Sequence, residues 1–438
     1  MKRAWVTSGI AVSSVLLLGV PLAAVASCAT NAEVGDVHHD AATPLPPNMP
    51  ADAALDGACD PSDADCTKEM AACESVSWCL TSTPLSPQHR LTAAWGTGKE
   101  DVWAVGSGGT ILHYDGSKWA ATPTGVRHTL HNVWGSGPRD IWVVSSTTLV
   151  LHGTGFRNGT AQWDRVPAPY DSSTSSSPPN PSPIYALWGS SRNDVRVGTE
   201  AFRLDIASAE FSYSGPSNQL VMSLGQDGSM WRALPGTGHY VRSIWGSSAS
   251  DVWMSVDNSK QVPGQRGLTF HGVPYEGPRP NPGIRDDPAC QYCSLNCTQC
   301  AIVDDPLEWT PIESQSQDIL EAIWGSSADD VWSVGERGTI RRFRKGDEVW
   351  QKVDSPTTRD LHAVWGSGPN DVWIAGDGGT ILHYDGVKVT HASAQFPVGP
   401  KPVLRGIWGS GPDDVWIVGD VVLHYTGPKP GVDEGGGM

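Results

Sequence analysis

A tryptophan-marked phrase recurs along the chain and limits the folds that the chain can adopt. In its clearest form it reads Trp-Gly-Ser-Gly-x-x-Asp-Val-Trp, followed by a glycine turn and a short run that ends near His-Tyr-Asp-Gly. The opening Trp-Gly pair occurs seven times, at Trp95, Trp134, Trp188, Trp245, Trp324, Trp365 and Trp408. The shorter spacings give a repeat of about 40 residues, and the longer spacings mark insertions.

Each copy of the phrase predicts four short strands. In the copy at 361–400, residues 361–365, 371–376 and 380–384 read as strands, and Asp377-Gly378-Gly379 supplies the glycines that a tight hairpin needs. A fourth strand is marked by a tryptophan, such as Trp350 in the preceding copy. Four strands at this period are typical of a β-propeller blade. Abundant glycine, proline and tryptophan with only 18% charged residues also favours an all-β chain.

The remaining tryptophans predict how the propeller closes. Six mark second strands (Trp103, Trp142, Trp253, Trp332, Trp373 and Trp416), with Arg196 in the seventh place, and six mark fourth strands (Trp119, Trp163, Trp231, Trp309, Trp350 and Trp78). Trp78 precedes the first copy, whereas the last copy stops after its third strand. We therefore expect an all-β, seven-bladed β-propeller over 76–427, closed by an N-terminal strand and carrying loop insertions.

The repeat resembles those of bacterial envelope propellers related to the BNR (Asp-box) and photosystem-assembly propeller families. The resemblance covers residues 76–427 and implies a propeller fold. The chain departs from the Asp-box itself, because the Ser-x-Asp-x-Gly-x-x-Trp turn is not found in that form. This departure weakens the transfer of sialidase-like activity to this chain.

The N-terminus predicts export. Lys2 and Arg3 precede an apolar stretch that ends in small residues, which is the layout of a signal peptide over 1–27. Val25-Ala26-Ser27-Cys28 resembles the bacterial lipoprotein box, so we expect lipid on Cys28 and an anchored protein at the cell envelope, in the outer membrane. Cleavage after Ala26 is the alternative, and it would release a secreted protein.

Further segments flank and interrupt the propeller. We expect a flexible lipid-anchored tether at 28–58, a cysteine-containing lead-in at 59–75 and a disordered tail at 428–438. Insertions fall at about 164–183, 206–228 and 273–303. The last two are expected between third and fourth strands, on one face of neighbouring blades, where loops bind partners. The binding candidates in the last insertion are Tyr275, Arg279, Arg285 and Tyr292.

The nine cysteines separate into Cys28 and two groups of four. The groups are Cys59, Cys66, Cys73 and Cys79, and Cys290, Cys293, Cys297 and Cys300. In an exported chain such groups favour disulfides, with three connectivities in each group. The paired Cys-x-x-Cys spacing of the second group also suits zinc or an iron–sulfur cluster, although we expect no metal and no cofactor.

Two polar positions recur in the copies. An aspartate precedes every second strand, at Asp101, Asp140, Asp194, Asp251, Asp330, Asp371 and Asp414. A basic residue ends the third strand, at His113, His152, His271, His383 and His424, with Arg203 and Arg342 in the equivalent places. Because these residues are spread around a ring, we expect the aspartates to cap turns and the histidines to make intra-blade hydrogen bonds.

No constellation predicts a catalytic residue, and three functions remain open. The net charge of −17 argues against a nucleic-acid partner and against membrane contact other than through lipid. The leading hypothesis is a monomeric, non-catalytic binding or assembly scaffold for an envelope protein or glycan. A glycan-binding protein or sialidase-like glycoside hydrolase is the alternative, with Phe202-Arg203-Leu204 as the nearest echo of its arginine motif. A redox or metal role for the second cysteine group is the third.

Overall fold

The computed structural model describes residues 64–146, 149–166, 183–199, 221–224, 231–233, 240–259, 266–274, 276 and 307–432. The chain divides into two compact units, Met1–Asp56 and Gly57–Met438, and every described residue belongs to the second. The predicted signal peptide, Cys28, the tether and Cys59 lie outside the described residues and stay predictions. Within the described ranges, no helix is long and apolar enough to cross a membrane.

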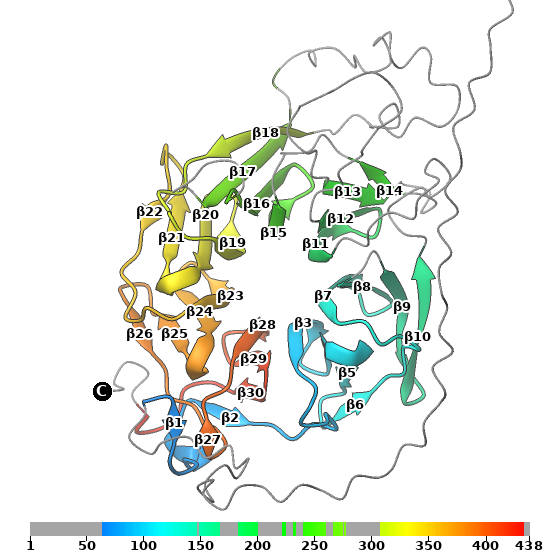
Figure 1. Ribbon diagram of the computed structural model, residues 1–438, viewed down its shortest axis with the longest axis vertical. Coiled ribbons are helices and arrows are strands. Elements are labelled where there is room, and N and C mark those ends of the chain that lie inside the picture. The colour runs from blue at the N-terminus through cyan, green and yellow to red at the C-terminus, as the bar shows by residue number, and fades with distance from the viewer. Residues whose placement is uncertain are drawn as a thin grey trace, which may run out of the picture. The chain divides into compact units, whose positions relative to one another are not determined.

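The described strands form seven four-stranded antiparallel sheets and one two-stranded sheet (Figure 1). We number the seven sheets in chain order. Sheet 1 contains β3 (Leu91–Gly98), β4 (Asp101–Gly106), β5 (Ile111–Tyr114) and β6 (Trp119–Ala121); sheet 2 contains β7 (Leu130–Gly137), β8 (Asp140–Ser145), β9 (Val150–Arg157) and β10 (Thr160–Val166); sheet 3 contains β11 (Ile184–Ser191), β12 (Asp194–Thr199), β13 (Val221–Leu224) and β14 (Trp231–Ala233).

Sheets 4 to 7 follow the same order of strands. Sheet 4 contains β15 (Tyr240–Ser248), β16 (Asp251–Asp257), β17 (Gly267–Pro274) and β18 (Leu307–Ile312); sheet 5 contains β19 (Leu320–Ser327), β20 (Asp330–Gly335), β21 (Ile340–Arg344) and β22 (Gln351–Lys352); sheet 6 contains β23 (Leu361–Gly368), β24 (Asp371–Gly376), β25 (Ile381–Tyr384) and β26 (Val389–His391); sheet 7 contains β28 (Leu404–Gly411), β29 (Asp414–Gly419), β30 (Val422–Tyr425) and β2 (Trp78–Leu80). The two-stranded sheet pairs β1 (Cys66–Thr67) with β27 (Gly399–Pro400). The expected all-β fold of four-stranded, propeller-like blades is confirmed.

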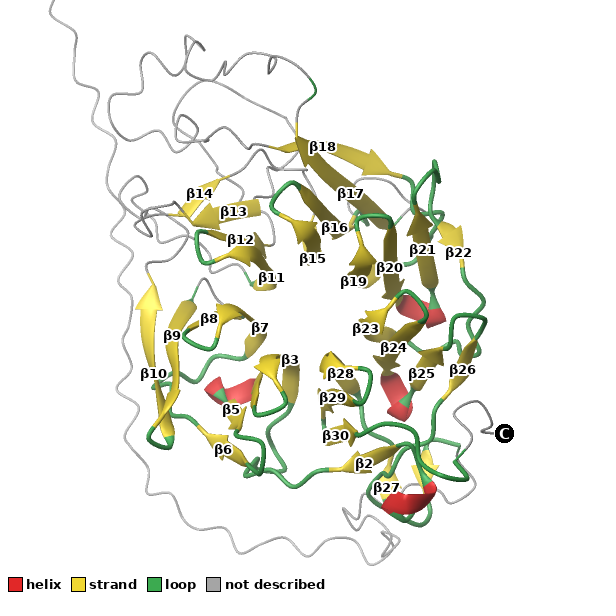
Figure 2. Ribbon diagram, turned by 180° about the vertical axis from the view of Figure 1, so that it is seen from behind, coloured by secondary structure: helices red, strands yellow, loops and turns green. Residues whose placement is uncertain are grey.

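The sheets stand around a common centre, with their first strands innermost (Figure 2). The first strands contact one another in the cyclic order β3, β7, β11, β15, β19, β23, β28 and back to β3. The second strands are buried on both faces, because a neighbouring sheet packs on each side. In β24, for example, Val372, Ile374 and Ala375 are fully buried. The apolar core is therefore divided among the spaces between sheets.

The Trp-Gly pair joins each sheet to the next. A Cβ atom on Gly135 would lie 2.5 Å from the ring of Trp95, which belongs to the preceding sheet. Only glycine fits beneath the ring, which explains why the two residues recur together. The same contact joins Trp95 to Gly135, Trp134 to Gly189, Trp188 to Gly246, Trp245 to Gly325, Trp324 to Gly366, Trp365 to Gly409 and Trp408 to Gly96.

The second-strand and fourth-strand tryptophans also pack between sheets. Trp416 of sheet 7 meets Trp119 of sheet 1 edge to face, with ring centroids 5.2 Å apart. Trp373 of sheet 6 meets Trp78 of sheet 7 in the same way at 5.0 Å. Such pairs bury large apolar areas and add a favourable edge-to-face contact. The expected role of these tryptophans in packing between blades is confirmed for these pairs.

Strand β2 is held from both sides. It pairs antiparallel with β30, where Trp78 lies opposite Tyr425. On its other side, the Trp78 amide donates to the Ser393 carbonyl at 3.1 Å, and the Gln395 amide donates to the Trp78 carbonyl at 2.9 Å. Trp78 is fully buried by these neighbours. The N-terminal strand β2 thus forms the outer strand of a sheet whose other three strands come from the C-terminal end of the chain.

The lead-in before β2 is fastened to the C-terminal end. A disulfide joins Cys73 to Cys79, and Cys66 is disulfide-bonded as well. The Lys429 ammonium donates to the carbonyl oxygens of Cys73 and Val76, each at 2.8 Å. These hydrogen bonds from Lys429 help to satisfy the carbonyl oxygens of the lead-in. Residues 428–432 are part of the described structure, whereas 433–438 lie outside the described residues, so the disordered tail predicted at 428–438 stays a prediction.

The largest difference from the sequence prediction is in sheet 3. Its third strand is β13, which lies inside the segment 206–228 that was expected to be an insertion. In register, Ser223 lies opposite Arg196, as His113 lies opposite Trp103 in sheet 1. Arg203 lies outside the described residues, and Ser223 holds the position assigned to it. This strand lacks the histidine that identifies third strands in the other copies, so the sequence of Val221–Leu224 did not indicate a third strand.

Two other insertion boundaries shift by a few residues. Strand β10 continues to Val166, and β17 continues to Pro274, so both connections begin later than 164 and 273. Pro274 lies opposite Leu307 in register, which makes the two ends of the long sheet 4 connection neighbours.

Candidate functional site

A side-chain network repeats in every sheet and holds the turn between the first two strands. In sheet 6, Ser367 Oγ donates to Asp371 Oδ2, and His383 Nε2 lies 2.7 Å from Asp371 Oδ1. The hydroxyl donors are Thr97, Ser136, Ser190, Ser247, Ser326, Ser367 and Ser410, and the basic partners are His113, His152, Arg196, His271, Arg342, His383 and His424. The predicted intra-blade hydrogen bonds of the histidines are confirmed.

The order of groups in this network does not suit nucleophilic catalysis. The Asp371 carboxylate lies between the Ser367 hydroxyl and the His383 imidazole, so the imidazole does not accept the hydroxyl proton. A serine nucleophile needs the base beside it. The network instead fixes the strands, as its sevenfold repetition suggests.

The network also lowers the pKa of its carboxylates. For Asp371, burial alone would raise the pKa, but hydrogen bonds from His383 and Ser367 and the charge of His383 bring it below 3.8. The pKa values of Asp101, Asp140, Asp251 and Asp414 are lowered by the same combination of groups. These carboxylates thus stay ionised and partnered at neutral pH.

Variation between the sheets is concentrated at one position near the centre. It directly follows the fully buried aliphatic residue near the start of each first strand, and in all seven sheets the pairing register shifts at it. The seven residues, which we call the rim residues, are Thr92, His131, Tyr185, Arg242, Glu321, His362 and Arg405, and all are partly exposed. The bulge turns their side chains out of the regular pleat.

Three rim residues pair with an acidic residue at the end of the second strand of the same sheet. Arg242 Nη2 donates to Asp257 Oδ2 at 2.9 Å in sheet 4, and Arg405 Nη1 donates to Asp420 Oδ1 at 2.9 Å in sheet 7. His362 Nε2 lies 2.8 Å from an oxygen of Asp377 in sheet 6. A basic rim residue beside an acidic strand end is therefore the pattern of these sheets.

Sheet 5 breaks this pattern, because both of its positions are glutamates. Glu336, which begins the short 3₁₀ helix η5 (Glu336–Gly338), accepts two hydrogen bonds from Arg266, at 2.7 and 3.2 Å. The rim residue Glu321 has no hydrogen bond or ion pair among the described residues. Burial raises its pKa, and the charges of Glu336 and Asp257 add to this against Arg242 and His362.

Aromatic and basic groups continue the rim in sheets 2 to 4. The rings of His131 and Tyr185 lie 4.8 Å apart, and the guanidinium of Arg242 lies 5.6 Å from the Tyr185 ring. Burial lowers the pKa of His131. The rim thus carries aromatic rings at His131 and Tyr185 and a guanidinium group at Arg242, and Arg242 is the neighbour of Glu321 along the rim.

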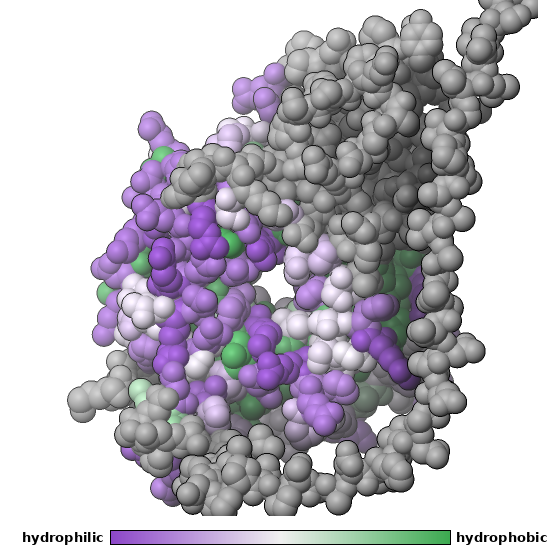
Figure 3. Space-filling view, viewed as in Figure 1, coloured by the Kyte–Doolittle hydropathy of each residue, from purple (hydrophilic) through white to green (hydrophobic). Residues whose placement is uncertain are grey.

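The rim residues lie on one face of the ring of sheets. In an antiparallel sheet, successive connections alternate between the two ends of the strands, and in the ring these ends form its two faces. Connections from second to third strands therefore share a face with those that lead to the next sheet. We call the face with these connections the rim face. Asp257, Asp377 and Asp420, which pair with rim residues, lie there at the ends of second strands. Polar residues dominate the view over sheets 5 and 6 in Figure 3.

This alternation corrects the predicted placement of the insertions. The long sheet 3 connection joins β12 to β13, so its ends lie on the rim face with those of the connection from β10 to β11. The sheet 4 connection joins β17 to β18 on the opposite face. The two insertions expected to share a face therefore leave the sheets on different faces, because β13 was missed.

The binding candidates proposed from sequence all lie outside the described residues. They are Tyr275, Arg279, Arg285 and Tyr292, and the second cysteine group, Cys290, Cys293, Cys297 and Cys300, lies outside as well. In the part of the chain that the structure describes, no three His, Cys, Asp or Glu side chains are grouped to hold a metal ion.

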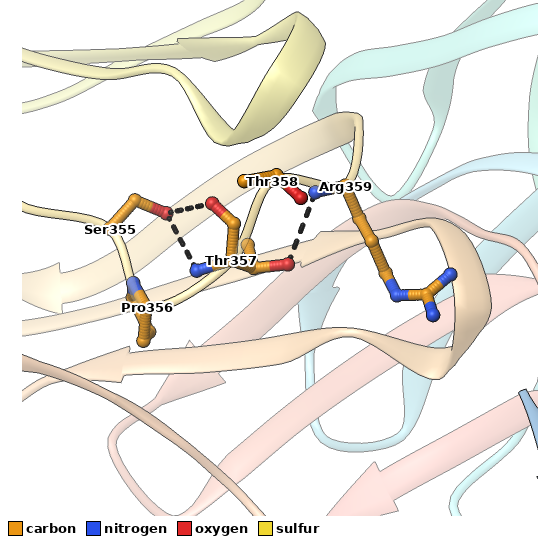
Figure 4. A pocket seen from close by; sticks show the side chains of 5 residues that line it. All are labelled: Ser355, Pro356, Thr357, Thr358 and Arg359. Carbon is orange, nitrogen blue, oxygen red and sulfur yellow. Dashed lines mark hydrogen bonds between the residues drawn. The ribbon is translucent and has the colours of Figure 1, made fainter. Parts of the chain in front are cut away.

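A shallow hollow of about 580 Å³ opens between β22 and β23, lined by 355–359 (Figure 4). Three of its polar groups are partnered within the segment, namely the Ser355 and Thr357 hydroxyls and the Arg359 amide. The Ser355 hydroxyl donates to the Thr357 carbonyl at 3.2 Å, and the Arg359 amide donates to Thr357 Oγ1 at 3.1 Å. The Arg359 guanidinium pairs with Asp65 of the lead-in. The hollow is therefore a weaker candidate than the rim.

The sequence prediction did not include the rim residues, because a repeat is recognised by residues that stay the same and these seven positions differ between the copies. The signal was present. Each rim residue lies three places before the tryptophan of its Trp-Gly pair and directly after a fully buried aliphatic residue, and lining up the copies there gives Thr, His, Tyr, Arg, Glu, His and Arg.

Comparisons with known proteins support the fold alone. No protein-family model and no curated protein matches the chain. Among solved structures, YCF48 bound to a D1 peptide is similar, with a TM-score of 0.55 and 15% identity over 83% of this chain and 100% of that chain. YCF48 from Cyanidioschyzon merolae gives 0.53 and 16% over 80% and 98%, and the WD40 propeller domain of Doa1 gives 0.51 and 10% over 81% and 98%. The described chain has the fold of a β-propeller.

Proposed function

We propose that this chain is a non-catalytic binding or assembly scaffold displayed at the bacterial cell envelope. Its body is a seven-bladed β-propeller closed by the N-terminal strand, and Cys28 carries the lipid that anchors it. Its partner is an extended segment of another envelope protein, which binds across the rim residues.

Contacts around the ring support the closed seven-bladed body. Each first-strand tryptophan packs over the glycine of the next sheet, and Trp408 of sheet 7 packs over Gly96 of sheet 1. Strand β2 occupies the fourth place of sheet 7, where β30 would otherwise present an open edge. Export and anchoring rest on the segment Val25-Ala26-Ser27-Cys28.

The observation that carries the binding proposal is the contrast between the two repeated positions. The Ser/Thr, Asp and His/Arg network is present in all seven sheets, whereas the rim carries charged, aromatic and small residues on the same scaffold. A constant framework with a varied central surface is how one fold presents a specific site. YCF48, which is similar in fold, is described as bound to a peptide, and this supports a peptide as the ligand class.

A photo-crosslinking experiment tests the proposal. A benzophenone amino acid replaces His131 at the rim, and in a control it replaces Glu348, which is exposed between β21 and β22 on the opposite face. The full-length chain is irradiated in envelope preparations, and adducts are mapped by mass spectrometry. We expect an adduct from position 131 that maps to one linear segment of a partner. Adducts from position 348 alone, or none from either, would contradict binding at the rim.

A further inference from the structure

We propose that Glu321 is the anchor of the rim site and that it receives a lysine or arginine side chain of the partner segment. This inference rests on the proposed function, because it specifies the chemistry of the segment that the rim binds. The occupant is an ammonium or guanidinium group that forms a charge-assisted hydrogen bond with the carboxylate.

The repeat itself indicates which group is missing. Sheets 4, 6 and 7 place a basic rim residue beside the acidic strand end, and the two side chains pair at 2.8 to 2.9 Å. In sheet 5 the rim residue is Glu321 and the strand end is Glu336. A basic group from outside the chain would restore in sheet 5 the pairing of charges that its neighbours have internally.

Every cationic group near Glu321 already has another carboxylate. Arg242 donates to Asp257, and Arg266 donates two hydrogen bonds to Glu336. The local set of Arg242, Asp257, Arg266, Glu321 and Glu336 thus contains three carboxylates and two guanidinium groups, which leaves one negative charge unmatched. His362, on the next sheet, lies against Asp377. Among the described residues, Glu321 is the carboxylate of this set that accepts no hydrogen bond, and Arg242 acts on it through its charge alone.

An organic cation fits this carboxylate better than a metal ion does. Metal ions of the kind that bind oxygen need several converging ligands. Among the described residues, no such group of acidic, histidine or cysteine side chains exists. One carboxylate suits a single basic side chain, and the aromatic rings of Tyr185 and His131, which continue the rim beyond Arg242, can contact the apolar parts of the same segment. The acidic charge of the whole chain, −17, favours approach of a basic segment.

A peptide array provides the test. The full-length chain is applied to short acetylated and amidated peptides with varied central positions, and the same array is probed with Glu321→Gln and with Glu348→Gln. Glu348 lies in the same sheet on the opposite face, so it controls for the change of charge. We expect wild type and Glu348→Gln to select peptides with a central Lys or Arg. Glu321→Gln should bind them about 10 to 100 times more weakly.

A charge reversal sharpens the test. Glu321→Arg gives sheet 5 the basic rim residue that its neighbours have, beside Glu336. We expect this variant to keep the melting temperature of the wild type and to lose the selection of basic peptides. Selection of basic peptides that survives in Glu321→Arg would overturn the role of Glu321.

The pH dependence supplies a second readout. The pKa of Glu321 is raised above 4.5 by burial and by Glu336 and Asp257, against Arg242 and His362. As the pH falls through this raised pKa, the carboxyl is protonated and the selected Lys peptide should dissociate, whereas its norleucine counterpart should be bound weakly at every pH.

The outcomes separate this inference from the proposed function. Peptides that bind without a basic preference, or equally to Glu321→Gln, would overturn the inference and leave a peptide-binding scaffold. An array on which no peptide binds above background would contradict the proposed function and the inference with it.

Discussion

Replacement of Trp78 with alanine tests whether the N-terminal strand belongs to the ring. Trp78 is fully buried and meets the rings of Trp373 and Tyr425 at centroid distances of 5.0 and 5.4 Å. A buried tryptophan removes roughly 200 Å² from water, worth about 5 kcal/mol at about 25 cal/mol per Å². Partial relaxation of the site reduces this, so we expect Trp78→Ala to lower the free energy of unfolding by about 3 to 5 kcal/mol.

Trp119 provides the matched control for this measurement. It holds the same fourth-strand position in sheet 1, is nearly buried and meets Trp416 edge to face at 5.2 Å. Both variants are measured by urea unfolding of the full-length chain, followed by tryptophan fluorescence and circular dichroism. If Trp119→Ala loses about 3 to 5 kcal/mol and Trp78→Ala loses almost nothing, the N-terminal strand does not contribute to the core and our reasoning is wrong.

Three further changes test other parts of the account. Asp371→Asn removes the carboxylate that partners Ser367 and His383, and it should lower the free energy of unfolding by about 1 to 3 kcal/mol. Because the pKa of Asp371 is lowered in the folded state, its stabilising contribution is present above pH 3.8 and is lost as the pH falls through the lowered pKa. The free energy of unfolding should therefore fall less steeply with acidification in Asp371→Asn than in the wild type. An Asn-Gly turn in place of 275–306 should leave the melting temperature unchanged, because Pro274 and Leu307 are already paired; loss of folding would make the cysteine group structural, and loss of partner capture with an intact rim would move the working surface to the opposite face. Cys28→Ser should move the protein from the detergent phase to the aqueous phase in a detergent partition, and unchanged partitioning would exclude the lipid anchor.

The strands could be predicted wherever a marker residue repeats. Trp373, Asp371 and His383 hold fixed places in sheet 6, so the sequence placed its first three strands within a few residues of those observed. In sheet 3 the second strand carries Arg196 in place of tryptophan, and the third carries Ser223 in place of histidine. The prediction failed there, and the faces assigned to the insertions were wrong in consequence.

The candidate site could not be predicted in the same way. A repeat is recognised by residues that stay the same because packing requires them, such as the glycine beneath each tryptophan ring. The rim residues are partly exposed, so packing restricts their size and charge less than at the buried positions, and they differ between copies. The significance of Glu321 also depends on contacts across sheets, since Arg266 of sheet 4 pairs with Glu336 of sheet 5.

The central claim is that a carboxylate at the rim binds a basic side chain, and a zero-length crosslink tests it most directly. A carbodiimide joins a carboxylate and an amine only when the two groups are in contact. The full-length chain is treated in the presence of a Lys peptide selected on the array, and the products are digested and sequenced by mass spectrometry. We predict an amide bond between Glu321 and the peptide lysine. Crosslinks that exclude Glu321 and fall on Glu348, or on the exposed Glu100 in the turn between β3 and β4, would contradict the account.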